Sequence, residues 1–212
     1  MGVRIALVHA VKVAIAPVEE AFRRHWPEAE LSNLLDDSLS RDRNRQGSLT
    51  PQLSRRIAAL AQYGVDAGAG AVLYTFSAFG EAIEAVKREQ KVPVLRPNEA
   101  MLDEALRLGR RIGMIATFAP TVPALEGELR ALDPQVSITS VCVPEAMTAL
   151  EAGDGATHDR LLALAAPQLG ICDAVILAQF STARAREAVA RAISCPVLTS
   201  PDSAVRRLKE LV

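Results

Sequence analysis

The chain has 212 residues, half of them apolar, and carries a formal net charge of −1. This length and apolar content allow one large domain or two small ones, each with its own core. The charge gives no electrostatic reason to expect nucleic acid or an anionic membrane as a partner, and an aromatic content of 4% offers no stacking platform for single strands. We therefore expect a small molecule as the partner, with assembly into homo-oligomers left open.

The first ten residues, MGVRIALVHA, enter a strand pattern almost at once, without a long apolar targeting region or a small-residue cleavage site. No apolar run approaches the roughly 18 residues of a membrane-spanning helix. The cysteines Cys142, Cys172 and Cys195 are odd in number and lack metal-ligand spacing, so neither a disulfide framework nor a metal site is expected. The sequence predicts a cytoplasmic protein.

Short apolar runs alternate with amphipathic stretches along the whole chain. In chain order the runs predict strands at Val3–Val8, Glu30–Leu35, Ala71–Thr75, Val92–Leu95, Arg111–Ala116, Val136–Val141, Ala174–Ala178 and Pro196–Leu198. Helical patterns lie between and after them, for example at Pro51–Tyr63, Asn98–Leu108 and Ser203–Val212. Strands that are apolar on both faces are typical of parallel sheets covered by helices, so the alternation predicts an α/β fold.

The sequence also repeats itself at intervals of 103 to 107 residues. The matching segments are VPVLRP from Val92 with CPVLTSP from Cys195, TFS from Thr75 with QFS from Gln179, and RIALVHA from Arg4 with RIGMIAT from Arg111. We expect two pseudo-symmetric Rossmann-like halves, each a four-stranded parallel sheet flanked by helices. The first half covers residues 1–97, with the C-terminal helix 203–212 packed back on it, and the second covers residues 98–202.

The two copies of the strand-end motif indicate where a ligand would bind. Parallel sheets bind ligands at the carboxyl ends of their strands, so we expect the motif to line a cleft between the halves from both sides. Ser77 and Ser181 offer hydroxyl groups there, and the helices that follow offer backbone N–H groups to an anion. The alternative is that these hydroxyls cap the helices that they precede.

The whole chain resembles the aspartate/glutamate/hydantoin racemase superfamily, which includes arylmalonate decarboxylase and maleate isomerase. The resemblance rests on the duplicated α/β halves, the polar residue after the first strand and the two strand-end motifs. In the racemases those strand ends carry a pair of cysteines, one taking a proton as thiolate and the other supplying one. Strand counting puts the first position at Thr75 or Phe76 and the second at Gln179 or Phe180. None of these side chains ionises near neutral pH, so the two-thiol mechanism is not expected.

The resemblance implies a cofactor-independent enzyme that acts on a small carboxylate by isomerisation, C–C cleavage or hydrolysis. The candidate catalytic residues are His9 as acid/base, with Thr75 and Gln179. The candidate substrate-binding residues are Ser77, Ser181, Thr117, Thr121, Phe76, Phe180 and Asp36; Thr117 and Thr121 match the place where superfamily members bind the substrate carboxylate. The alternatives are a structural role for His9, an ordinary core position for both rings, and a catalytically inactive protein that binds small anions.

The longest polar stretch, NLLDDSLSRDRNRQGSLTP, follows the second strand and places Asp36 at the strand end. Its arginines Arg41, Arg43 and Arg45 either close over an anionic ligand or belong to a solvated loop, and we favour the loop. Elsewhere, His25 and His158 are expected on the surface. Cys142 and Glu145 come at the end of the sixth strand, and the surface is the favoured place for Glu145.

Overall fold

A computed structural model describes residues 2–77 and 79–212 of the chain. Its strands are β1 Arg4–His9, β2 Glu30–Leu35, β3 Ala71–Tyr74, β4 Val94–Leu95, β5 Arg111–Ala116, β6 Ser137–Cys142, β7 Ala174–Leu177 and β8 Val197–Thr199. The α-helices are α1 Ile15–His25, α2 Leu39–Gln46, α3 Pro51–Asp66, α4 Gly80–Glu89, α5 Glu99–Leu108, α6 Thr121–Leu132, α7 Pro144–Glu151, α8 Gly155–Ala165, α9 Arg186–Ala192 and α10 Ser200–Leu211. Short 3₁₀ helices are η1 Lys12–Ala14, η2 Ala166–Leu169 and η3 Ser181–Ala185.

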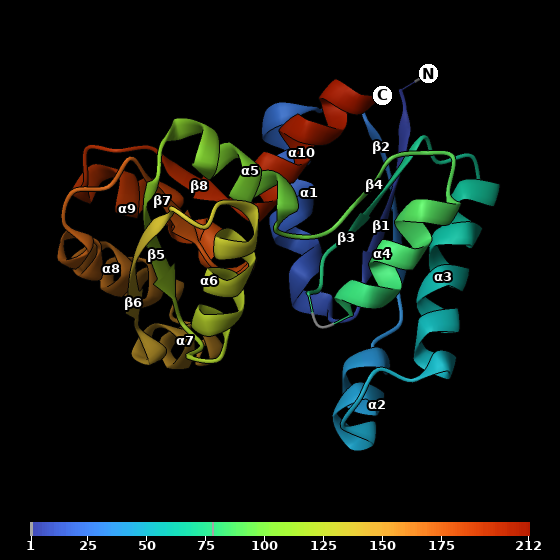
Figure 1. Cartoon of the computed structure of the whole chain (residues 1–212), viewed down its shortest axis with the longest axis horizontal. Coiled ribbons are helices and arrows are strands. Elements are labelled where there is room, and N and C mark those ends of the chain that lie inside the picture. The colour runs from blue at the N-terminus through green and yellow to red at the C-terminus, as the bar shows by residue number, and fades with distance from the viewer. Residues whose placement is uncertain (1, 78) are drawn as a thin grey trace. The chain divides into compact units, whose positions relative to one another are not determined.

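The strands form two parallel four-stranded sheets with the same order, β2-β1-β3-β4 and β6-β5-β7-β8 (Figure 1). All eight strands lie where the apolar runs predicted them, with ends that differ by two residues at most. The predicted α/β fold with two four-stranded parallel sheets flanked by helices is confirmed. The identical strand order also bears out the duplication, because equivalent strands begin 103 or 107 residues apart.

The chain divides into two compact units. Unit 1 contains the residues up to Ala100 together with Ala204–Val212, and unit 2 contains Met101–Ser203. The chain therefore passes between the units twice, once within α5 and once within α10. Among the residues that the structure describes, no helix has both the length and the apolar character needed to cross a membrane.

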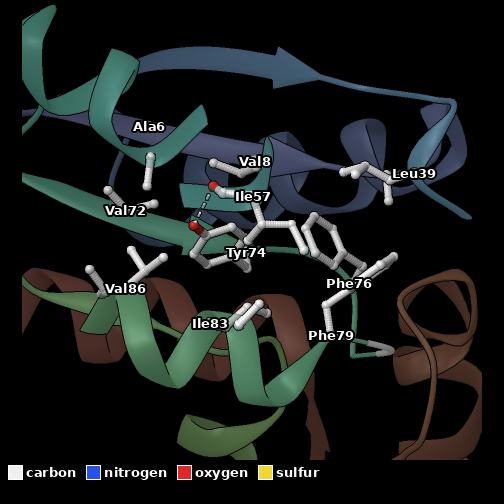
Figure 2. Packing of buried hydrophobic residues seen from close by; sticks show 14 of the residues in the cluster. Ala6, Val8, Leu39, Ile57, Val72, Tyr74, Phe76, Phe79, Ile83 and Val86 are labelled. Carbon is white, nitrogen blue, oxygen red and sulfur yellow. Dashed lines mark hydrogen bonds between the residues drawn. The ribbon is translucent and has the colours of Figure 1, made fainter. Parts of the chain in front are cut away.

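One core cluster of unit 1 lies where α3 and α4 meet one face of the first sheet (Figure 2). Helix α3 begins with Thr50, whose side chain accepts a hydrogen bond from the backbone N–H of Leu53, and with a proline at its first position. Its buried stripe ends at Gly64, where an added Cβ would lie 2.5 Å from the Cβ of Ala6. Glycine thus lets the helix approach β1 closely.

Aromatic rings fill the end of this core nearest to α4. Tyr74 is fully buried, and its hydroxyl donates a 3.0 Å hydrogen bond to the carbonyl of Ile57 (Figure 2). The ring of Phe76 packs edge-on against Tyr74 and Phe79, with centroid distances of 5.4 and 5.3 Å. Burial of three aromatic side chains, with the hydroxyl of the one tyrosine satisfied, stabilises the strand end that carries the first motif.

The core of unit 2 covers both faces of its sheet. Met114 of β5 belongs to a cluster with Leu125 of α6 and residues of α5, whereas its neighbour Ile115 belongs to a cluster with Leu162 of α8 and Val189 of α9. Successive residues of a strand point to opposite faces, so α5 and α6 cover one face and α8 and α9 cover the other.

Helix α2 forms where a solvated loop was expected, so that prediction is wrong. Only Leu39 of this helix is buried, and the helix has no apolar stripe that the sequence could reveal. Arg56 of α3 holds the segment in place by ion pairs to Asp36, at 2.5 Å, and to Asp42, at 2.6 Å. The helix ends at Gly47, which adopts a φ of 68°.

Candidate functional site

The backbone fixes which residues of the two strand-end motifs are equivalent. The N–H of Thr75 donates to the carbonyl of Val8, and the N–H of Ala178 donates to the carbonyl of Ile115, both at 3.0 Å. Thr75 therefore corresponds to Ala178, and Phe76 to Gln179. In the sequence, TFS and QFS lie 104 residues apart, whereas β3 and β7 begin 103 residues apart. The sequence match is therefore shifted by one residue from the structural equivalence.

His9 and Thr75 meet at the carboxyl end of the first sheet. Their neighbours Val8 and Tyr74 point into the core under α3, so His9 and Thr75 share the opposite face. The Nδ1 atom of His9 lies 2.9 Å from the hydroxyl of Thr75, and its Nε2 lies 2.9 Å from the Oδ1 of Asn33. His9 has no exposed surface and Thr75 is 5% exposed. Side chains from three neighbouring strand segments thus form a polar chain that is buried at Thr75 and His9 and reaches the surface at Asn33.

A carboxylate sets the direction of the hydrogen bonds in this chain. The Nδ2 atom of Asn33 donates to Glu19 of α1 at 2.8 Å, which leaves the Asn33 Oδ1 as an acceptor facing His9. The Nε2 of His9 consequently carries a proton. In the neutral imidazole, Nδ1 then accepts a hydrogen bond from the hydroxyl of Thr75 at 2.9 Å, and the Val8 carbonyl lies farther from the same hydroxyl, at 3.3 Å. The arrangement Thr75–His9–Asn33–Glu19 places a base between a hydroxyl group and an orienting amide.

Burial favours the neutral form of this histidine. Desolvation lowers the pKa of His9 below its ordinary value, and it outweighs the Asn33 hydrogen bond and the Glu19 charge, which act in the opposite direction. A neutral imidazole at neutral pH can accept a proton.

The equivalent strand ends of unit 2 hold a different set of polar groups. Gln179 accepts a 3.1 Å hydrogen bond through its Oε1 from the backbone N–H of Thr117. Thr182 donates its hydroxyl to the Gln179 carbonyl at 2.7 Å, and the N–H of Gln179 lies 3.2 Å from that hydroxyl oxygen. The Nε2 of Gln179 is buried and has no partner among the described residues. The side chain is thus held with its oxygen engaged and its two N–H groups free.

The other predicted hydroxyls do not cap helices. Ser77 is exposed, and α4 has Phe79 at its N-cap position without a side-chain hydrogen bond. Ser181 lies in η3 and Thr121 begins α6, and neither of these helices has a side-chain cap. The alternative that Ser77 and Ser181 serve as N-caps is therefore wrong, and a role of Ser77, Ser181 and Thr121 in binding stays a prediction.

The predicted site residues fall into separate groups in the structure. His9 and Thr75 are joined by a hydrogen bond in unit 1, and Thr117 and Gln179 are joined in unit 2. The ring of Phe76 belongs to the core, in agreement with the alternative for that residue, whereas Phe180 is half-buried. The prediction that the two halves bind a ligand between them stays a prediction.

The carboxylate of Asp36 is engaged by its neighbours. Its Oδ1 accepts from the hydroxyl of Ser38 at 2.7 Å, and its Oδ2 accepts from Arg56. Burial raises the pKa of Asp36, but the hydrogen bonds from Ser38 and Arg56 together outweigh that effect and lower it. The geometry therefore gives Asp36 a structural role in fixing α2 against α3.

Comparison with known proteins identifies the family. The family model described as Asp/Glu/Hydantoin racemase matches residues 16–207, which is well over half of the chain. The chain belongs to this family. A search of curated protein sequences found no match.

Solved structures of similar fold include members of several racemase types. Allantoin racemase from Klebsiella pneumoniae is 18% identical with a TM-score of 0.74, and the alignment covers 99% of this chain and 87% of that one. An aspartate racemase homologue from Pyrococcus horikoshii is 16% identical with a TM-score of 0.70, covering 98% of both chains. A double mutant of arylmalonate decarboxylase in the liganded form is 19% identical with a TM-score of 0.68, covering 99% and 92%. At these sequence identities, the similarity to the solved structures shows the fold alone.

The cysteines of this racemase-family chain lie apart from the strand ends that carry the motif. Cys172 precedes β7 and Cys195 precedes β8, whereas Cys142 ends β6. Burial raises the pKa of all three thiols, and the charge of Glu145 raises that of Cys142 further. A raised pKa keeps a thiol protonated near neutral pH, when it is a poor base. In the described part of the chain, no group of His, Cys, Asp and Glu residues is arranged to hold a metal ion.

His158 lies in the interior of unit 2, so its predicted surface position is wrong. The side chain has no exposed surface, and its Nδ1 lies 2.7 Å from the Oδ1 of Asp159. It lies near the start of α8, and the polar residues around it in the sequence led to the prediction that it is exposed. The packing of α7 and α9 against α8 encloses it instead.

Proposed function

We propose that the chain is a cofactor-independent enzyme that moves a proton on a small carboxylate with one acid–base group, the imidazole of His9. Family membership supports the small-carboxylate substrate and the absence of a cofactor. The observation that carries the proposal is the hydrogen-bonded chain of Thr75, His9, Asn33 and Glu19 at the end of the first sheet. Cysteine does not take part.

The hydroxyl of Thr75 passes the proton in this scheme. His9 is fully buried, so a ligand reaches its Nδ1 only by way of the Thr75 hydroxyl. As the substrate C–H bond breaks, its electron pair moves to the carboxylate oxygens and the proton goes to Thr75 Oγ1. The hydroxyl proton moves at the same time to His9 Nδ1. The resulting imidazolium is stabilised by the Asn33 Oδ1 and the charge of Glu19.

The second half of the chain lacks an equivalent base. Ala116 stands where the first half has His9, and Ala178 stands where it has Thr75. Racemisation by two bases requires one on each side of the carbon. A single base returns the proton to the side from which it was taken, or protonates a carbanion on one side after loss of CO₂. We therefore propose an isomerase or lyase reaction and expect no racemisation of aspartate, glutamate or hydantoins.

Hydrogen exchange with D₂O tests the proposal. Small carboxylates, including substituted malonates, maleate and amino acids, are incubated with the protein and followed by NMR for deuterium at carbon, for isomerisation and for CO₂ loss. We expect turnover of at least one substrate that is abolished by His9→Gln and by Thr75→Val and retained in Thr75→Ser. Cys142→Ser serves as the matched control and should leave turnover unchanged. Turnover that survives His9→Gln, or that requires Cys142, would overturn the proposal.

The alternative is a catalytically inactive protein that binds a small anion. The free N–H groups of Gln179 favour it, because buried donors without a partner bind an acceptor at little cost in desolvation. Carboxylate binding without turnover of any substrate would decide for this alternative.

A further inference from the structure

A groove in unit 2 has a lining that includes none of the candidate site residues described above. It has a volume of about 450 Å³ and runs along α8, the end of η3 and α9. Helices α8 and α9 lie against each other on the face of the sheet opposite α5 and α6 (Figure 1). The lining residues are Ala156, Asp159, Arg160, Ala163, Arg184, Glu187, Ala188 and Arg191. Small alanine side chains thus leave a hollow that three arginines surround.

Two of these arginines form no ion pair among the described residues, although the charge of Arg160 lowers the pKa of Asp154. No hydrogen bond or ion pair of Arg160 or Arg191 exists among the described residues, and both side chains are exposed. Arg184 differs, since its Nε donates to the Oδ1 of Asp159 at 2.9 Å. Guanidinium groups that converge on one hollow repel one another unless an anion lies between them.

The third arginine, Arg184, is held in position by neighbouring residues. The Asp159 oxygen that accepts from Arg184 also accepts from the fully buried His158. Gly155 leaves the space for the guanidinium, because a Cβ there would lie 2.2 Å from the Arg184 Nη2. The buried His158, through Asp159, and the absence of a Cβ at Gly155 thus fix the Arg184 guanidinium beside the first turn of α8.

We propose that this groove binds a small oxyanion of the phosphate type, with Arg160, Arg184 and Arg191 as its ligands. Their planar N–H forks match the oxygens of phosphate or of a carboxylate. Asp159 is already satisfied by His158 and Arg184, so Glu187 is the one carboxylate of the groove that opposes an anion. The site is independent of the His9 chemistry, since none of its residues belongs to that network.

Titration calorimetry of the full chain with inorganic phosphate, pyrophosphate, sulfate and malonate tests the site. We expect binding of phosphate or pyrophosphate that the double variant Arg160→Gln/Arg191→Gln weakens at least ~10-fold, about 1.4 kcal/mol. Glu187→Gln should tighten binding, because it removes the opposing charge. Gly155→Ala should weaken it by displacing Arg184. Tighter binding of malonate than of phosphate would identify a dicarboxylate as the ligand and overturn the phosphate assignment.

The matched control is Arg107→Gln. Arg107 is exposed on α5, on the opposite face of the sheet, and no interaction of its side chain exists among the described residues. This variant should bind like the wild type. No binding of any of the four anions, equal losses in Arg107→Gln and in the double variant, or an unchanged affinity in Glu187→Gln would each overturn the proposal. Because all these side chains except Gly155 are exposed, circular dichroism should show unchanged folding.

Discussion

The pH dependence of stability gives a direct test of the protonation state of His9. The pKa of His9 is lowered in the folded protein, chiefly by burial, whereas in the unfolded chain it returns to about 6.5. Below that value the unfolded chain therefore binds a proton that the folded protein resists. The stability associated with His9 is fully present above the unfolded pKa and is lost as the pH falls toward the folded one.

The size of the effect follows from linkage. If His9 stays neutral in the folded protein, lowering the pH from about 6.5 to about 5.5 costs RT ln(11/2), which is about 1 kcal/mol of unfolding free energy. We expect the wild type to lose up to this amount more than His9→Gln over the same interval. The difference between the pH dependence of the unfolding free energy of the wild type and that of His9→Gln removes the contributions of the other titrating groups. It also removes any pH-independent effect of the substitution on stability.

Urea unfolding followed by tryptophan fluorescence measures the slopes. Trp26 is the only tryptophan of the chain, is 8% exposed and stacks on Phe22 in unit 1, so it reports on the unit that contains His9. Parallel curves for wild type and variant would refute a lowered pKa. A wild type that gains stability on acidification relative to His9→Gln would show that His9 is an imidazolium donating to both Thr75 and Asn33, and the proposed base would be lost.

Three further substitutions test the packing that supports the site. Thr75→Val should lower the unfolding free energy by about 1–3 kcal/mol, because it leaves the buried His9 without its Nδ1 partner. Thr75→Ser keeps the hydroxyl and should retain most of that stability. Tyr74→Phe should cost about 1 kcal/mol through loss of the hydrogen bond to Ile57, and an unchanged urea midpoint would count against that bond. Gly64→Ala should destabilise by about 1–3 kcal/mol despite the better helix propensity of alanine, since the new methyl group collides with β1; a rise in thermal stability would contradict the close approach.

The strands were predictable because their signal is local. Runs such as Arg111–Ala116 are apolar on both faces, and the structure covers both faces with helices. The repeat reinforced the prediction, since each half supported the other. The register of the strand ends was harder to predict. TFS and QFS match at a spacing of 104 residues, whereas the backbone hydrogen bonds from Thr75 to Val8 and from Ala178 to Ile115 make Thr75 equivalent to Ala178, 103 residues later. Identical residues in two loops do not determine the hydrogen-bond register of the strands that precede them.

The errors concern residues whose environment is set by distant segments. Helix α2 has a polar sequence and is tied down by Arg56, which lies beyond it in the chain. His158 is enclosed by the helices that pack around α8. Within the candidate site, His9 was found because it ends a strand, whereas Asn33 and Glu19 were missed. Each of them looks like an ordinary polar residue until β2 and α1 bring it to the imidazole.

The duplication distinguishes features that both halves share from chemistry that only one half carries. Glu19 accepts from Asn33 in the first half, and Glu126 accepts from the hydroxyl of Ser140 at 2.8 Å in the second, with both partners displaced by 107 residues. A helix carboxylate bonded to the outer strand is therefore common to both halves and serves the fold. The imidazole and hydroxyl occur only in the first half, where the second has alanines. Because the scaffold pair already fixes a carboxylate and an acceptor beside this position, a histidine placed there gains an oriented Nε2–H without further substitutions. The asymmetry between the halves is thus the feature on which the proposed one-base reaction at the first sheet rests.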